Sequence, residues 1–146
     1  MVPDTRFTGV LLSLVLVTAA AAAPLTGSVR RISDGDSFTL VSQRGEVRIQ
    51  LCGISSPERK QKGWAIASIE LGKLTQGKQV VCVPVGEGTV CDGRSGATIG
   101  TRTVAQCSAM GKDLAEAMVR GGFACDQPKF SGGHYKALVG AAACTK

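Results

Sequence analysis

The chain has 146 residues, a formal net charge of +6 at neutral pH, six cysteines and one histidine. A single histidine excludes a metal site built from several histidines, and the lack of any Cys-x-x-Cys pair argues against a zinc site. The length allows one domain with a modest core. The basic balance favours anionic partners, although a need for solubility accounts for it equally well.

The first 23 residues have the pattern of a secretory signal peptide, because an apolar run over 10–17 and alanines over 19–23 precede Pro24. The apolar run is shorter than the roughly 20 residues that span a bilayer. We therefore expect cleavage, with no stable membrane insertion afterwards. Residues 24–146 would then form a single exported domain, periplasmic or extracellular. An uncleaved leader that anchors the chain is the alternative.

The cysteines all lie in the part that would be exported. They are Cys52, Cys82, Cys91, Cys107, Cys125 and Cys144. An oxidising compartment favours disulfides, and an even count permits every cysteine to be paired, although the sequence leaves the pairing open. We therefore expect a disulfide-containing domain.

Three strands that alternate apolar and polar residues open the mature chain. They are predicted over 27–33, 38–43 and 46–51, with turn residues between them. In the third strand the apolar side chains share one face, whereas Arg48 and Gln50 share the other. The pattern predicts a three-stranded meander.

Helices and strands follow one another in the rest of the chain. They are a helix over 63–74, a strand over 78–85, a glycine-rich loop over 86–100, a strand over 102–107, a helix over 113–121, a loop over 123–131 and a helix over 135–143. Trp64 has the helical spacing expected of core packing. Asp113 and Glu116 resemble a capping box at the start of the second helix. Five strands in this arrangement are compatible with a small OB-type barrel, one option among several α+β folds.

Three short motifs carry most of the functional information. Asp34-Gly35-Asp36 joins the first two strands, LCGISSPE over 51–58 closes the third, and TRTVA over 101–105 begins the fifth. Their order and spacing resemble the thermonuclease family, the staphylococcal-nuclease type of secreted phosphodiesterase, over about residues 27–139. The resemblance implies an α+β, mainly β fold: a five-stranded OB-fold barrel with about three helices. Each motif alone also has an ordinary explanation, the first as a common turn.

Calcium-dependent hydrolysis of phosphodiester bonds in DNA or RNA is the activity that the resemblance implies. Asp36 matches the first calcium-binding aspartate, Glu58 the glutamate beside the attacking water, and Arg102 the second phosphate-binding arginine. Ser56 stands where a threonine offers its main-chain carbonyl to the metal. Such chemistry needs a cation beside the phosphate, an oriented water and donors for the transition state.

Two positions depart from the family pattern. Ser55 stands where a second metal-binding aspartate is expected, and its hydroxyl brings no charge to a calcium ion. Gln50 stands where the first arginine is expected, and it lacks both the positive charge and the fork of donors. Asp34 is a candidate substitute ligand, and Arg48, on the same strand face as Gln50, is a candidate substitute cation. We therefore expect calcium binding and cleavage to be weakened or lost.

Candidate contacts to a nucleic-acid substrate are Gln50 in the third strand and two residues near the C-terminus. Tyr135 follows a glycine-containing loop and is a candidate for base stacking, with Lys136 supplying charge beside it. The interpretation favoured by the sequence is a thermonuclease-like domain that binds nucleic acid or another polyanion with little cleavage. An active secreted endonuclease and a structural subunit joined to an unidentified protein partner are the alternatives.

Overall fold

The computed structural model describes residues 22–139. The predicted leader lies almost entirely outside the described residues, and so does Cys144. The elements are β1 (Leu25–Asp34), β2 (Ser37–Ser42), β3 (Gly45–Leu51), β4 (Ile54–Ser55), α1 (Trp64–Thr75), β5 (Val80–Pro84), β6 (Thr98–Ile99), β7 (Arg102–Ala109), β8 (Lys112–Asp113), α2 (Leu114–Arg120), β9 (Cys125–Asp126), α3 (Pro128–Ser131) and α4 (His134–Val139). Within this part of the chain, no helix is both long enough and apolar enough to cross a membrane.

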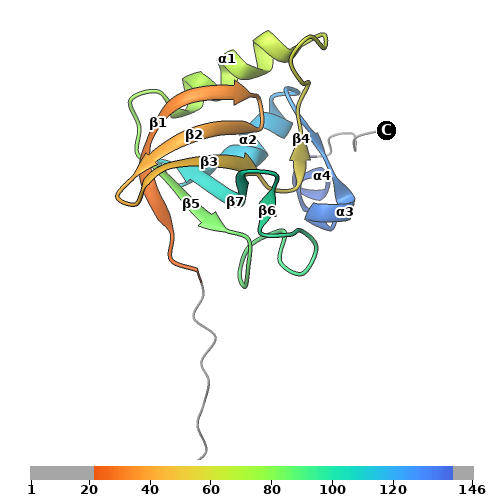
Figure 1. The fold of residues 1–146 in the computed structure, drawn as a ribbon. Coiled ribbons are helices and arrows are strands. Elements are labelled where there is room, and N and C mark those ends of the chain that lie inside the picture. Colours follow the sequence, from red (N-terminus) through yellow and green to blue (C-terminus); the bar gives the residue numbers. More distant parts are fainter. Residues whose placement is uncertain (1–21, 140–146) are drawn as a thin grey trace, which may run out of the picture.

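The five longer strands form a closed barrel, which Figure 1 shows with α1 lying along β1. β1, β2 and β3 are an antiparallel meander, β5 pairs with β1, and β7 pairs with β5. A parallel pairing between β3 and β7 closes the ring. The structure thus confirms the predicted mainly β, OB-type barrel, with four short helices instead of about three.

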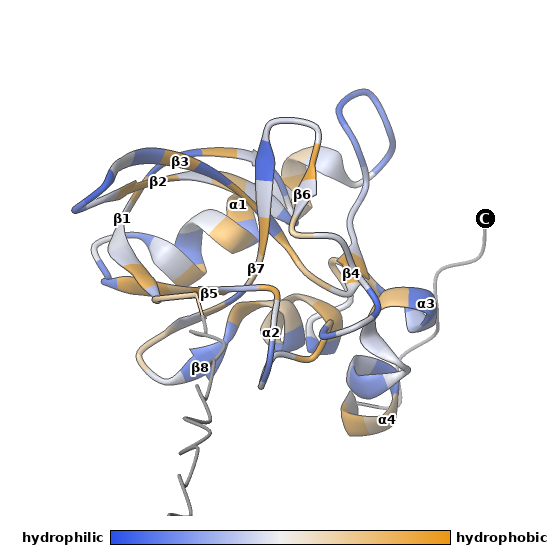
Figure 2. Ribbon diagram, turned by 60° about the horizontal axis from the view of Figure 1, so that its bottom comes forward, coloured by the Kyte–Doolittle hydropathy of each residue, from blue (hydrophilic) through white to orange (hydrophobic). Residues whose placement is uncertain are grey.

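Alternation along the strands fills the barrel interior. Phe38 lies opposite Ile49, and Leu40 lies opposite Val47, so that their side chains meet on the inner face. Figure 2 shows the alternation as successive orange and blue segments. β1 is bulged between Val29 and Arg31, which adds the bend that a closed barrel needs. The meander predicted from the alternation is therefore present.

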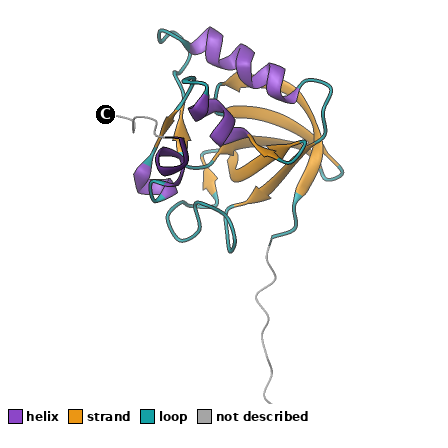
Figure 3. Cartoon of the chain, turned by 180° about the vertical axis from the view of Figure 1, so that it is seen from behind, coloured by secondary structure: helices purple, strands orange, loops and turns teal. Residues whose placement is uncertain are grey.

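α1 and α2 begin and end close to the predicted positions, and α4 begins one residue before the predicted helix, whose predicted end at 143 lies outside the described residues. Asp113 caps α2 and accepts a hydrogen bond from the main-chain N–H of Glu116, so the predicted capping box start is confirmed in part. The segment 123–131, predicted as loop, instead contains β9 and α3. Pro128 occupies the first turn of α3, where a missing N–H costs nothing. In Figure 3, α2 lies between α1 and the pair formed by α3 and α4, which agrees with the contacts of α2 with both α1 and α4.

Between described cysteines, two disulfides join strands and loops of the barrel. Cys82 and Cys107 are bonded across the paired strands β5 and β7, and Cys52 is bonded to Cys91. Cys125 is also engaged, and no described cysteine is free. The disulfides agree with folding in an oxidising compartment. The bond between Cys52 and Cys91 ties the long 86–100 loop to the end of β3.

Candidate functional site

A pocket of about 410 Å³ opens at the end of β3, beside β4 and α3. Its lining contains most of the residues that the motifs singled out. These are Asp34, Asp36, Gln50, Ser55, Ser56, Glu58 and Arg102. Arg48, Tyr135 and Lys136 do not line it. Motifs far apart in the sequence therefore converge on one hollow of the barrel.

The Asp34-Gly35-Asp36 turn lies tightly against α1 and the β4 segment. A Cβ atom on Gly35 would lie 2.7 Å from the Cβ of Ala67 and 3.0 Å from the Cβ of Ser56. Real Cβ atoms do not approach so closely, so only glycine allows this close packing. Asp36 consequently sits at the pocket floor, where the main-chain N–H of Ser56 donates to its carboxylate at 3.1 Å.

Asp34 is held by neighbouring side chains. Its two carboxylate oxygens accept hydrogen bonds from Nε1 of Trp64 at 2.9 Å and from Oγ of Ser37 at 3.0 Å. Trp64 is only half-buried, and its indole N–H also lies 3.1 Å from the main-chain oxygen of Ser33. The prediction that Trp64 belongs to the core is wrong, because the hydrogen bonds of its indole N–H hold the half-buried ring beside Ser33 and Asp34.

Burial sets the protonation of Asp36. Removal from solvent raises the pKa of this carboxyl above its ordinary value, and the nearby charge of Asp34 raises it further. The hydrogen bonds from Ser56 and Gln50 and the positive charge of Arg102 lower the same pKa, but burial outweighs them. The pocket floor therefore holds its negative charge less readily than an exposed aspartate would.

Gln50 lies between Asp36 and Arg102 in the pocket. Register places it opposite Ser37, next to Asp36, to which it makes a side-chain hydrogen bond. On its other side, Oε1 accepts a hydrogen bond from the guanidinium of Arg102 at 2.5 Å. A neutral amide thus joins Asp36 to Arg102. Gln50 therefore supplies a neutral acceptor to the guanidinium of Arg102.

Ser55, Ser56 and Glu58 complete the pocket from the chain that leaves β3. Ser55 pairs with Cys125 in the short β4–β9 ladder, so its backbone position is fixed. The Ser56 hydroxyl is buried and has no hydrogen-bond partner among the described residues. Glu58 is exposed at the rim of the pocket. Its main-chain N–H donates a hydrogen bond to Oε1 of Gln61 at 2.7 Å. Only Glu58 offers a carboxylate free to face an incoming solute.

The donor set does not fit calcium. This ion takes six to eight oxygen ligands and draws affinity from carboxylates. In the described part of the chain, no group of three or more acidic, cysteine or histidine side chains is arranged to hold a metal. Asp36 is bonded to Ser56 and Gln50, and both oxygens of Asp34 are engaged. Ser55 adds no charge to compensate.

Arginines continue from the pocket across the outer face of the barrel. Arg31 and Arg48 flank Thr39 on three adjacent strands, and Arg48 donates to the Thr101 hydroxyl at 2.9 Å, one residue before Arg102. We call Arg31, Arg48 and Arg102 the arginine row. None of the three ion pairs in residues 22–139 involves a member of this row. Arg48 therefore lies beside the pocket and does not replace Gln50 within it.

Tyr135 is the clearest correction to the predicted site. Its side chain is fully buried in the core, and its hydroxyl donates to Asp113 at 3.2 Å. Burial raises the pKa of the Tyr135 phenol, as expected for a group removed from water. The ring cannot stack on a base, because it packs with the barrel core. Lys136 is exposed on α4 but lies outside the pocket lining.

The pocket also contains side chains that the motifs did not indicate. They are Arg59, Ser95, Ile99, Gln127 and Phe130. Ser95 and Ile99 come from the 86–100 loop, which the bond between Cys52 and Cys91 ties down beside the pocket. The sequence left the partner of Cys91 open, so the position of this loop could not be predicted. Phe130 belongs to α3, which lies in the segment 123–131 predicted as loop.

Comparison with known proteins leaves the family unassigned. No protein-family model matches the chain, and a search of curated proteins found no match either. The chemistry of the pocket and of the arginine row is therefore what the function must be argued from.

Proposed function

We propose that this chain is an exported, thermonuclease-like protein that binds nucleic acid or another polyanion and cleaves phosphodiester bonds weakly or not at all. The observation that carries the proposal is the arginine row: Arg31 and Arg48 make no ion pair with an acidic side chain of residues 22–139, and Arg102 is bonded to the neutral Gln50. The row offers charge to an anion, whereas Asp34 and Asp36 of the pocket beside it already accept hydrogen bonds.

Weak cleavage follows from the contents of the pocket. Losing one preorganised transition-state donor typically costs about a hundredfold to a thousandfold in rate. Gln50 removes one such donor and also occupies Arg102, so that the remaining guanidinium starts the reaction already bonded. Ser55 removes a carboxylate from the metal position. Both losses act on the same transition state.

Binding is expected from the guanidinium groups of the row, since Arg31 and Arg48 are exposed and Arg102 is partly exposed. An arginine that neutralises a phosphate releases a counterion, so binding weakens as salt increases. If all three members of the row contact phosphates of a single strand, the logarithm of the binding constant should fall with the logarithm of salt at a slope of about −2. Cleavage is not needed for this behaviour. Threonines at 39 and 101 lie between the arginines and can donate to phosphate oxygens as well.

Fluorescence anisotropy with a labelled single-stranded oligonucleotide, in calcium and in chelator, tests this proposal. We expect salt-sensitive binding in both, and a weaker affinity with a shallower salt slope for Arg31→Ala with Arg48→Ala. The matched control is Lys112→Ala with Arg120→Ala, which removes equal charge from residues that do not line the pocket. Equal losses in the two variants, or no binding at all, would overturn the proposal. Absence of binding would favour the structural subunit.

A second candidate, an active endonuclease, is favoured by the convergence of Asp36, Ser56, Glu58 and Arg102 on one pocket. Its test is the release of acid-soluble nucleotides from DNA and RNA. Calcium-dependent release by the wild type that is abolished in Glu58→Ala would support the enzyme. Release that persists in Glu58→Ala would point to a contaminating nuclease.

A further inference from the structure

The outward side of α1 is apolar where a solvent-facing helix is usually polar. Ile66 is 60% exposed and Ile69 is 57% exposed, whereas Ala67, Leu71 and Thr75 are buried against the barrel. Their spacing of three residues makes the two isoleucines neighbours on one side of the helix. The other large exposed apolar side chains in residues 22–139 are on separate elements. The isoleucine pair is therefore an uncovered apolar strip.

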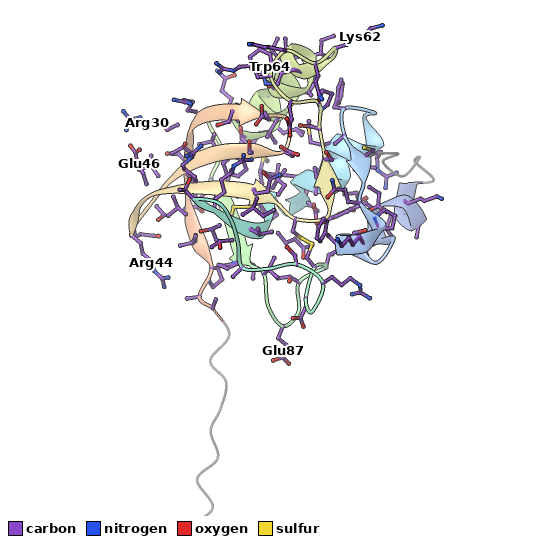
Figure 4. The ribbon with its side chains drawn as sticks, turned by 45° about the vertical axis from the view of Figure 1, so that its right-hand side comes forward. Arg30, Arg44, Glu46, Lys62, Trp64 and Glu87 are labelled. Carbon is purple, nitrogen blue, oxygen red and sulfur yellow. A yellow bond between two sulfur atoms is a disulfide. The ribbon has the colours of Figure 1, made fainter. Side chains whose placement is uncertain are left out.

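Positive charge surrounds this strip. Arg59, Lys60 and Lys62 precede α1, and Figure 4 shows Lys62 projecting outward near Trp64 at the start of the helix. Lys73 is exposed one turn beyond Ile69. Cations therefore lie beyond both ends of the apolar strip.

A shallow groove extends the same surface onto β1. It has a volume of about 490 Å³ and brings Arg30 and Arg31 beside Ile69 and Lys73. Two of these cations have acidic partners, Arg30 with Glu46 and Lys73 with Glu70; Figure 4 shows the side chains of Arg30 and Glu46 together. We call the isoleucine pair and its surrounding residues the α1 face; its charged members are Arg30, Arg31, Glu46, Glu58, Arg59, Lys60, Lys62, Glu70 and Lys73. Six cations and three acids leave this face with an excess of three positive charges.

We propose that the α1 face docks on an anionic phospholipid surface, with α1 lying in the plane of the interface. Exposed isoleucines between cations match what such a surface offers: apolar acyl chains at the headgroup boundary and negative charge around them. A second copy of the chain would bring like charges together. A nucleic acid would use the cations but would leave Ile66 and Ile69 in water. This inference does not depend on the proposed function of the pocket.

The expected strengths are measurable. A lysine or arginine close to an anionic membrane contributes about 1 kcal/mol, so removing one should weaken partitioning about fivefold. Replacing both isoleucines with serine should weaken it further, on the order of tenfold, because the buried apolar area is lost. Docking should also weaken with salt, since the charge contribution is screened.

Sedimentation with vesicles tests the docking. The full chain is mixed with vesicles of phosphatidylglycerol and phosphatidylcholine in equal amounts, and with pure phosphatidylcholine. We expect binding to the anionic vesicles, weakened in Ile66→Ser with Ile69→Ser and in Lys62→Ala with Lys73→Ala. The matched control is Met110→Ser with Leu138→Ser, which removes two side chains that are 77% and 50% exposed on other elements. The control should bind as the wild type does.

Several outcomes would overturn the docking proposal. These are equal binding to neutral vesicles, unchanged binding of the isoleucine variant, or an equal loss in the Met110 and Leu138 control. Circular dichroism confirms that each variant is folded. Light scattering in the absence of lipid provides a second test: a wild-type dimer that the isoleucine variant does not form would assign the strip to self-association instead. Equal loss of oligonucleotide and vesicle binding in the isoleucine variant would assign it to nucleic acid.

Discussion

The pocket and the arginine row lie side by side, but the charged side chains of the two regions have different kinds of partner. In the pocket, Asp34 is bonded to Trp64 and Ser37, and Asp36 reaches Arg102 through Gln50. On the neighbouring outer face, the row has guanidinium groups with no acidic partner among the described residues. Among the described residues, the aspartates of the pocket have hydrogen-bond donors, whereas Arg48 and Arg102 of the row are bonded to neutral side chains. The presence of a charged residue at the pocket therefore does not by itself show that its charge is available to a ligand.

The largest effect is expected from adding an arginine and an aspartate to the pocket. Gln50→Arg with Ser55→Asp adds a fork of donors and a carboxylate to the pocket, and removes the amide that occupies Arg102. We expect calcium-dependent cleavage to rise by at least about a hundredfold. Release of acid-soluble nucleotides with calcium and with chelator is the measurement. Gln50→Lys with Ser55→Asn is the matched control, since it brings neither the fork nor the second carboxylate. Strong cleavage by the wild type would contradict the inference of impairment.

Filling the turn should have the next largest effect. Gly35→Ala places a methyl group 2.7 Å from the Cβ of Ala67, and overpacking of this kind typically costs about 1–3 kcal/mol of unfolding free energy. Urea denaturation measures it. Gly72→Ala is the control: its nearest neighbour would be Ile32 at 3.9 Å, and alanine within a helix should stabilise the chain by up to about 1 kcal/mol. A Gly35 variant as stable as the wild type would show that the turn and α1 are not closely packed.

The barrel could be predicted from the sequence because its signals are local and periodic. Alternation in 38–43 and 46–51 predicted that Phe38 and Ile49 lie on the inner face, and Asp113 indicated the start of α2. The resemblance to the thermonuclease family implied that Asp36 and Arg102 would belong to one site, and both line the pocket. These features depend on period, turn chemistry and order, which can all be read along the chain.

The rest depends on contacts between segments far apart in the sequence. Tyr135 was expected at a surface because it follows glycines, yet its ring is buried in the core and its hydroxyl donates a hydrogen bond to Asp113. Trp64 was assigned to the core by helical spacing, although a hydrogen bond to Asp34 holds it at the pocket edge. Likewise, the pairing of Cys52 with Cys91 cannot be derived from spacing.

Trp64→Phe should lower the free energy of unfolding by less than Gly35→Ala does. The ring volume is largely kept, but Asp34 and the Ser33 carbonyl lose the indole N–H. Loss of a hydrogen bond to a charged group typically costs about 1.5–3 kcal/mol, and partial exposure should bring this closer to 1 kcal/mol. Thermal unfolding measures the change. Phe130→Leu, in the lining of the pocket, is the control for lost aromatic surface. An equal loss in both would show that the hydrogen bond contributes nothing.

The smallest effect should be a pH trend confined to the acid range. Because the Asp36 pKa is raised in the folded state, the native protein holds its proton more tightly than the unfolded chain, so stability falls as pH rises from about 3.8 through the raised value. Asp36→Asn has no such proton. The unfolding free energy of Asp36→Asn relative to the wild type should therefore increase with pH across this window and level off above it. Urea denaturation at a series of pH values measures the difference. An opposite slope would mean that hydrogen bonds from Ser56 and Gln50, and not burial, dominate this carboxyl.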